Sequence, residues 1–309
     1  MPDFRNFSVA VIGAGPAGLF AARELAHAGI RVALINRDIK PGGLAEYGIY
    51  PSKLKMKDGL RRQFQLALEL PGLEYYGNLT LGTEGELGLA ELQQMGFDAV
   101  LVTVGAQGTK WLGLPGEDLE GVYHAKDLVY HYNQLPPFSQ GKYEIGKRVV
   151  CIGVGNVMLD IAHWAIRALK VDRIIAIARR GPADVKFSRK EMEIVARNLD
   201  LAALDAEFER TAPVMQKVGQ DPAAAKAFIL SALDHAEESV SETRFELAFL
   251  VSPKRILGDN EGRVRALEVE DTTLETRPDG NTRDVGLGTT REIPADTVVF
   301  CIGDRVDET

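Results

Sequence analysis

The chain has 309 residues, of which 45% are hydrophobic, and its formal net charge is −8. That length exceeds the needs of one ordinary domain and suits two, each able to bury a core. The acidic balance argues against nucleic acid as a partner, because surfaces that bind it carry clustered Lys and Arg. Neither a signal peptide nor an apolar run of membrane-spanning length is evident, which favours a cytoplasmic location and no membrane partner.

The two cysteines, Cys151 and Cys301, lie 150 positions apart, and no C-x-x-C motif exists. This spacing excludes a thioredoxin-type dithiol and a cysteine-clustered zinc or iron–sulfur site. Both cysteines lie in apolar runs, so we expect buried, reduced core residues. No Ser–His–Asp set or metal cluster is evident, so we assign neither a catalytic side chain nor a metal site.

The first recognisable unit is an apolar strand, Ser8–Ile12, followed by G-A-G-P-A-G, a helix reaching about residue 28 and a strand, Arg31–Ile35. In such a unit Gly13 allows the tight turn, Gly15 lets a diphosphate approach the backbone, and Gly18 lets the helix pack closely on the strand. The helix N-terminus adds free N–H groups and partial positive charge. The context predicts a dinucleotide site.

The acidic residue that usually binds the ribose at the end of the second strand is absent. Asn36 occupies the position, followed by Arg37 and Asp38. An Asn side chain can bond a ribose hydroxyl, but it can equally be a polar strand end.

The next segment contains a Lys/Arg-rich helix over about 52–69, a strand over 99–103 and a Pro/Gly-rich connection over 112–121. A basic face attracts an acidic protein partner, although a solvated helix face is the alternative. The residues of this possible basic face are Lys53, Lys55, Lys57, Arg61 and Arg62.

A second strand–turn–helix–strand unit begins with Arg148–Ile152 and closes with Arg173–Ile177. Gly153 and Gly155 repeat the glycine pattern, but Met158 stands where a third small residue belongs, which should separate helix and strand slightly. Strands that alternate with helices indicate parallel sheets, so the fold class is α/β.

Arg179 and Arg180 end the second strand of this unit, where a protein that binds NAD would carry an acid. An acid would repel the 2′-phosphate of NADP, whereas two guanidinium groups can hold it through paired hydrogen bonds. The alternative is a pair of solvated arginines. A helical region follows over 188–238, then strands over 245–251 and 264–270, a polar hairpin or mobile loop over 271–291, and a last strand over 297–302.

Seven motifs in chain order carry a family resemblance: G-A-G-P-A-G, G-G-L-A-E-Y-G-I, V-G-A-Q, L-P-G-E-D-L-E-G, G-V-G-N-V-M-L-D-I-A, A-R-R-G-P and F-L-V-S-P. The set resembles the adrenodoxin reductase-like ferredoxin–NADP reductases, and its second motif is also similar to the small subunit of glutamate synthase. The resemblance implies two Rossmann-like domains, with an NADP-binding domain over 107–302 inserted into an FAD-binding domain. The latter would comprise residues 1–106 and the return segment 303–309.

The resemblance also implies cofactor contacts. The FAD set is Gly13, Gly15, Pro16, Ala17 and Gly18, with Asn36 as the possible ribose contact and Gly43 and Leu44 approaching the flavin. The NADP set is Gly153, Gly155, Asn156, Val157, Arg179 and Arg180, with Glu191 near the nicotinamide ribose or else an ordinary helix Glu. The implied activity is electron transfer between NADPH and an iron–sulfur protein such as ferredoxin through FAD.

Two departures from the family pattern qualify this expectation. A histidine usually follows G-I-Y-P, and here Lys53 occupies its place. The family chain also continues beyond the motif near Gly303 and completes the flavin pocket, so we expect weakened FAD binding by these 309 residues. The alternatives are an electron-input subunit of a larger complex and a nucleotide-binding protein that lacks flavin. The oligomeric state is not predicted.

Overall fold

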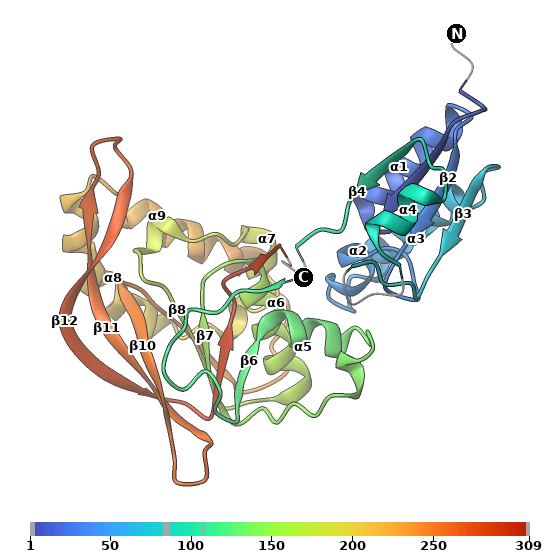
Figure 1. Ribbon diagram of the computed structural model, residues 1–309. Coiled ribbons are helices and arrows are strands. Elements are labelled where there is room, and N and C mark those ends of the chain that lie inside the picture. The colour runs from blue at the N-terminus through green and yellow to red at the C-terminus, as the bar shows by residue number, and fades with distance from the viewer. Residues whose placement is uncertain (1–3, 83–86, 107, 307–309) are drawn as a thin grey trace. The chain divides into compact units, whose positions relative to one another are not determined.

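The computed structural model describes residues 4–82, 87–106 and 108–306, which form two compact units (Figure 1). One unit comprises residues 1–109, 129–141 and 304–309, and the other comprises residues 110–128 and 142–303. Gln107 of the V-G-A-Q motif and the last three residues lie outside the described part of the chain.

The first unit is built on a four-stranded parallel sheet of order β3-β2-β1-β4. Successive residues of β1 point to opposite faces of this sheet. Val9 and Val11 pack with Leu19 and Phe64 of two helices, whereas Ala10 and Ile12 pack with Leu92. The strands are β1 (Ser8–Ile12), β2 (Arg31–Ile35), β3 (Leu73–Tyr76) and β4 (Ala99–Val102); the helices are α1 (Pro16–His27), α2 (Leu44–Tyr47), α3 (Leu54–Leu68) and α4 (Leu89–Gln94). Both faces are covered, as parallel sheets require.

The second unit combines a five-stranded parallel sheet of order β6-β13-β7-β8-β9 with a three-stranded antiparallel sheet of order β10-β11-β12. One core cluster joins them: Val150, Ile175 and Phe300 of the parallel sheet pack with Leu267 and Val269 of the antiparallel sheet. The strands are β6 (Val122–His124), β7 (Arg148–Ile152), β8 (Arg173–Ile177), β9 (Arg244–Ala248), β10 (Val251–Gly258), β11 (Val264–Thr276), β12 (Thr282–Pro294) and β13 (Thr297–Phe300).

Among the described residues, five α-helices are associated with the second unit. One of them, α5, begins in this unit and ends in the first. They are α5 (Ala125–Tyr132), α6 (Asn156–Trp164) with a π-helical continuation (Ala165–Leu169), α7 (Arg189–Met192), α8 (Leu201–Lys217) and α9 (Pro222–Leu230). Short 3-10 turns of the second unit lie at Pro182–Asp184, Ala196–Asn198 and Ser231–His235. In the first unit, a 3-10 turn lies at Phe138–Gln140, and a small ladder pairs β5 (Gly108–Thr109) with β14 (Asp304–Arg305).

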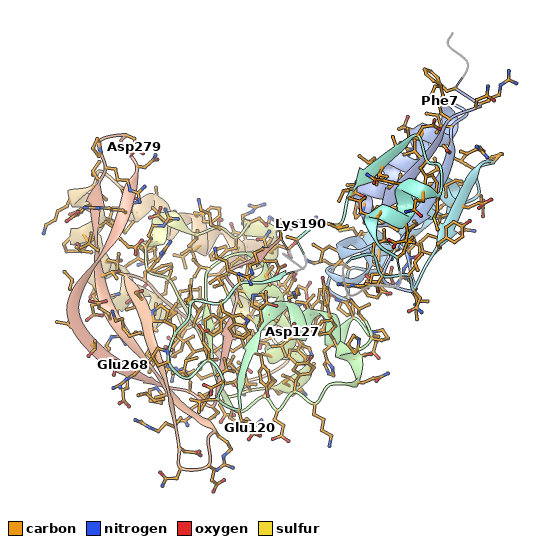
Figure 2. All side chains as sticks on the ribbon, viewed as in Figure 1. Phe7, Glu120, Asp127, Lys190, Glu268 and Asp279 are labelled. Atoms are coloured by element: carbon orange, nitrogen blue, oxygen red, sulfur yellow. The ribbon has the colours of Figure 1, made fainter. Side chains whose placement is uncertain are left out.

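The expected fold class is confirmed: the protein is α/β, with two units that each contain a parallel sheet. The strands that flank both glycine turns have the expected bounds, and the polar segment is a hairpin whose tip carries Asp279 (Figure 2). The expected strand over 245–251 is confirmed only as far as Ala248, because the chain turns at Leu250, where φ is +50°. Residues before this turn extend the parallel sheet as β9, and those after it form β10.

The observed division of the chain differs in detail from the expected domain boundaries. The expected boundaries after residues 106 and 302 lie within three positions of the observed ones after Thr109 and Gly303. Val129–Gly141, which we placed in the second domain, groups with the first unit. The functional assignment of each unit stays a prediction. In the described part of the chain, no helix has both the length and the apolarity of a membrane span.

Candidate functional site

The first glycine turn is fixed by close backbone contacts. Gly13 has φ of +98°, and a β-carbon there would lie 2.6 Å from the carbonyl oxygen of Thr103. A β-carbon at Gly18 would overlap the carbonyl oxygen of Gly13 and lie 2.6 Å from Thr103 Oγ1. The Thr103 hydroxyl donates to the carbonyl oxygens of Ile12 and Gly13, each at 2.9 Å. Glycine is therefore required at positions 13 and 18 by the fold itself.

Gly15 differs from these two residues, because a β-carbon there would meet no heavy atom within 4 Å. It is the N-cap of α1, with Pro16 as the first helical residue. The segment that carries the second motif lies against it: Gly42 N donates to the carbonyl oxygen of Ala14 at 2.7 Å, and a β-carbon at Gly43 would lie 3.0 Å from Gly15 Cα. Bare backbone at a helix N-terminus, open on one side, fits a diphosphate.

Asn36 lies at the end of β2 and is only 8% exposed. Its Oδ1 accepts a hydrogen bond from Ala14 N at 3.0 Å, and its Nδ2 donates to the carbonyl oxygen of Asp38 at 2.9 Å. Tyr75 OH lies 3.3 Å from the same Nδ2. Asn36 thus ties the glycine turn to the loop that follows β2, and this arrangement favours the strand-end interpretation over a ribose contact.

The possible basic face on α3 needs one correction. Lys57 is 5% exposed, and its Nζ donates to Asn133 Oδ1 at 2.9 Å. It shares the inward stripe of α3 with Phe64 and Ala67, so it does not belong to an exposed face. Burial lowers the pKa of the Lys57 ammonium. Arg61 is exposed, but it is held by Glu46 through two hydrogen bonds of 2.8 and 2.6 Å.

The second glycine turn repeats the geometry of the first. Gly153 has φ of +118°, and a β-carbon there would overlap the carbonyl oxygen of Cys301. Gly155 is the N-cap of α6, and a β-carbon there would again meet nothing within 4 Å. Met158, at the place of Gly18, is fully buried, so this turn accommodates a long side chain where the first admits none.

The backbone of the two arginines is held by β11 and by the turn at Leu250. Thr272 Oγ1 of β11 donates to the carbonyl oxygen of Arg179 at 2.7 Å, and Leu250 N donates to that of Arg180 at 3.1 Å. The side chains face acids: Arg179 Nε lies 3.4 Å from Asp284 Oδ1, and an Arg180 guanidinium nitrogen lies 3.4 Å from Asp184 Oδ1.

A cavity of about 680 Å³ joins the second glycine turn to the arginine pair. Of the residues identified from sequence, it is lined by Gly153, Gly155, Arg179 and Arg180. Asn156, Val157 and Glu191 are not among its lining residues, and Val157 is exposed.

Asn156 is nevertheless tied to the segment that carries Glu191. Asn156 Oδ1 accepts a hydrogen bond from Ser188 N at 2.8 Å, and Ser188 is the N-cap of α7, which contains Glu191. Lys110 and Lys186, which were not identified from the sequence, also line the cavity. Lys186 follows Arg180 by six positions, and this closeness in sequence is the one feature that could have indicated its place in the cavity.

Cys151 and Cys301 are both buried and free, which confirms the expectation of core cysteines. Cys151 lies on β7, and Cys301 directly follows the neighbouring strand β13. Burial raises the pKa of the Cys301 thiol well above its ordinary value. Reactive cysteines need a stabilised thiolate, so this environment is that of a structural residue.

Comparison with known proteins is consistent with this geometry. The family model of pyridine nucleotide-disulphide oxidoreductases matches residues 7–212. NADPH-ferredoxin reductase FprA of Mycobacterium leprae is 29% identical over 96% of this chain and 70% of its own length. The mitochondrial NADPH:adrenodoxin oxidoreductase of Arabidopsis thaliana is 28% identical over 97% of this chain and 68% of its own length.

Among solved structures, FprA of Mycobacterium tuberculosis in complex with NADPH superposes with a TM-score of 0.81 at 28% identity. The superposition covers 97% of this chain and 71% of that protein. These relatives confirm the resemblance to adrenodoxin reductase-like ferredoxin–NADP reductases that the sequence motifs indicated.

Proposed function

Because this chain belongs to the pyridine nucleotide-disulphide oxidoreductase family, we propose that it is an FAD-dependent oxidoreductase that passes electrons between NADPH and an iron–sulfur protein such as ferredoxin. The observation that carries the proposal is the pair of glycine turns. Each leaves one glycine, Gly15 or Gly155, open in front of a helix N-terminus, and only the second has an arginine pair beside it.

FAD is assigned to the first turn and NADP(H) to the second. Gly13, Gly15 and Gly18 shape a turn that fits the FAD diphosphate, and Gly43 lies directly against it. Arg179 and Arg180 line the cavity of the second turn, where a third, 2′-phosphate group would lie. A bound flavin supplies the chemistry that links a two-electron donor to a one-electron acceptor. The chain contributes binding, orientation and charge.

The arginine pair should give a preference for NADPH over NADH. A charged, paired contact contributes about 1.5–3 kcal/mol, which is roughly 10- to 150-fold in affinity. Replacing both arginines by alanine should therefore erase most of the preference, measured as the ratio of the two coenzymes' dissociation constants. An unchanged ratio in the double variant would overturn the assignment of the arginine pair to the 2′-phosphate.

The visible spectrum tests the flavin part of the proposal. Because these 309 residues are expected to bind FAD weakly, the purified protein is assayed with FAD in excess, where it should perturb the flavin absorption near 450 nm and reduce a dye with NADPH. A colourless protein that binds NADPH alone would favour the flavin-deficient alternative. Stable co-purification with a large subunit would favour the electron-input alternative.

The iron–sulfur partner would dock through charge. Of the basic residues on α3 and at its N-cap, Lys55 and Arg62 are exposed and Lys53 is half-buried. They would attract an acidic ferredoxin and raise its association rate at low salt. Charge reversal by Lys55→Glu with Arg62→Glu should slow ferredoxin reduction at low salt while leaving dye reduction unchanged.

The proposal also includes a cytoplasmic location for this protein.

A further inference from the structure

The segment that follows the arginine pair is attached to the second glycine turn at two points. Lys186 N donates to the carbonyl oxygen of Val154 at 2.9 Å, and Lys186 forms an isolated parallel bridge with Gly155. Two residues further on, Ser188 N donates to Asn156 Oδ1 at 2.8 Å. The backbone of Lys186 therefore lies beside the open glycine that begins α6.

Lys186 is also one of the residues that line the cavity of the second turn, together with Lys110, Arg179 and Arg180. Asp184 is the one acid among the lining residues of this cavity, and it is engaged by Arg180 and by Gln220 Nε2 at 3.1 Å. Within residues 4–82, 87–106 and 108–306, the Lys186 ammonium takes part in no ion pair or hydrogen bond. Lys186 therefore adds a cation to a cavity whose lining already includes Lys110, Arg179 and Arg180, and in the described part of the chain its ammonium has no acidic neighbour at contact distance.

We propose that Lys186 is a further coenzyme-binding residue, which holds the diphosphate rather than the 2′-phosphate of the dinucleotide. The inference rests on the proposed function of the second unit. In a Rossmann-type site the diphosphate lies at the glycine turn and the helix N-terminus, whereas the 2′-position is read at the end of the second strand. Lys186 is bridged to Gly155 of the turn, and the arginines follow the end of β8.

This placement predicts a pattern that separates Lys186 from the arginines. NADP⁺ and NAD⁺ share the diphosphate, whereas NADP⁺ and adenosine 2′-monophosphate share the 2′-phosphate. Lys186→Ala should raise the dissociation constants of NADP⁺ and NAD⁺ by the same factor, roughly two- to fivefold for an exposed ion pair, and leave adenosine 2′-monophosphate unchanged. The double arginine variant should weaken NADP⁺ and adenosine 2′-monophosphate and spare NAD⁺.

Isothermal titration calorimetry of the full chain with these three ligands is the test, at two salt concentrations because the contribution is electrostatic. Lys186→Arg should keep most of the affinity. Lys190→Ala is the matched control, because Lys190 (Figure 2) is an exposed cation on α7 that is not among the cavity's lining residues. Circular dichroism verifies that each variant is folded.

Three results would overturn the inference: unchanged affinities in Lys186→Ala, a loss confined to NADP⁺ and adenosine 2′-monophosphate, or an equal loss in Lys190→Ala. The proposed function fails by a different result, namely a double arginine variant whose NADP⁺ to NAD⁺ ratio equals that of the parent. The two failures are therefore distinguishable within one set of titrations.

Discussion

Gly15→Ala should separate cofactor binding from folding at the first turn. The new methyl group would meet no heavy atom within 4 Å, and the φ of −73° at this position is accessible to alanine. Alanine is a poorer N-cap than glycine, which costs about 0.5–1 kcal/mol, but it restricts the unfolded chain and so regains about 0.4–1 kcal/mol. The free energy of unfolding should therefore change by less than about 1 kcal/mol.

The same methyl group would occupy the space that the diphosphate of FAD needs. Forcing a methyl group into a close-packed contact typically costs about 1–3 kcal/mol, or roughly 5- to 150-fold in affinity. Gly155→Ala is the matched variant at the second turn, where a β-carbon is equally unopposed. We expect Gly15→Ala to weaken FAD and spare NADP⁺, and Gly155→Ala to do the reverse. The larger Gly15→Val should abolish FAD binding.

The assay measures FAD by quenching of flavin fluorescence and NADP⁺ by calorimetry, with urea unfolding of each variant. Gly18→Ala is the structural control, because its methyl group would overlap the carbonyl oxygen of Gly13 and should destabilise the fold by about 3 kcal/mol or more. If Gly15→Ala weakens NADP⁺ and spares FAD, the order of the two sites is reversed. If it affects neither ligand, the open face of the turn is not a diphosphate site.

Three further substitutions test single contacts. Asp284→Asn should lower the NADPH dissociation constant a few-fold and leave NADH unchanged, because it frees Arg179 for the 2′-phosphate; weaker NADPH binding would contradict this. Asp296→Ala should cost about 1–3 kcal/mol in urea unfolding at pH 7, because Asp296 accepts backbone and side-chain hydrogen bonds from Arg148. Arg148 holds the pKa of Asp296 below the ordinary 3.8, so this stability is present above pH 3.8 and is lost as the pH falls through the folded-state pKa. If the parent and the Asp296→Ala variant still differed in their free energies of unfolding below that pKa, the assignment would be refuted. Asn36→Ala should lower stability by about 1–3 kcal/mol and weaken FAD more than NADP⁺, and equal weakening of both would argue against its role in the first turn.

The central parallel strands could be predicted from sequence because their signals are local. β1 and β7 are five-residue, largely apolar strands, and each is followed directly by a glycine that must adopt a positive φ. The arginine pair was likewise identified by its place at the end of β8, and the cavity joins it to the second glycine turn. In each unit the candidate cofactor-binding residues lie at the carboxyl ends of parallel strands. A residue that directly follows such a strand in the sequence can therefore be assigned to the site.

The missed features depend on contacts between segments that are distant in sequence. Lys57 reads as one of several basic residues, but its partner Asn133 lies 76 positions away. Asn36 replaces the expected acid, and its partner Ala14 N belongs to the preceding glycine turn. Leu250 adopts a left-handed conformation that its residue type does not favour, so no local pattern indicated the break between β9 and β10.

The support of the arginine loop by β11 has a consequence for protein engineering. The carbonyl oxygen of Arg179 is held by Thr272, which lies 93 positions further along the chain. A short A-R-R-G-P loop grafted onto another dinucleotide-binding protein would leave this support behind. On the proposed assignment of Arg179 and Arg180 to the 2′-phosphate, coenzyme selectivity is not a portable property of the loop, and a transplant should include the antiparallel ladder. Conversely, Thr272→Val could retune coenzyme choice in the parent protein from a position outside the cavity lining.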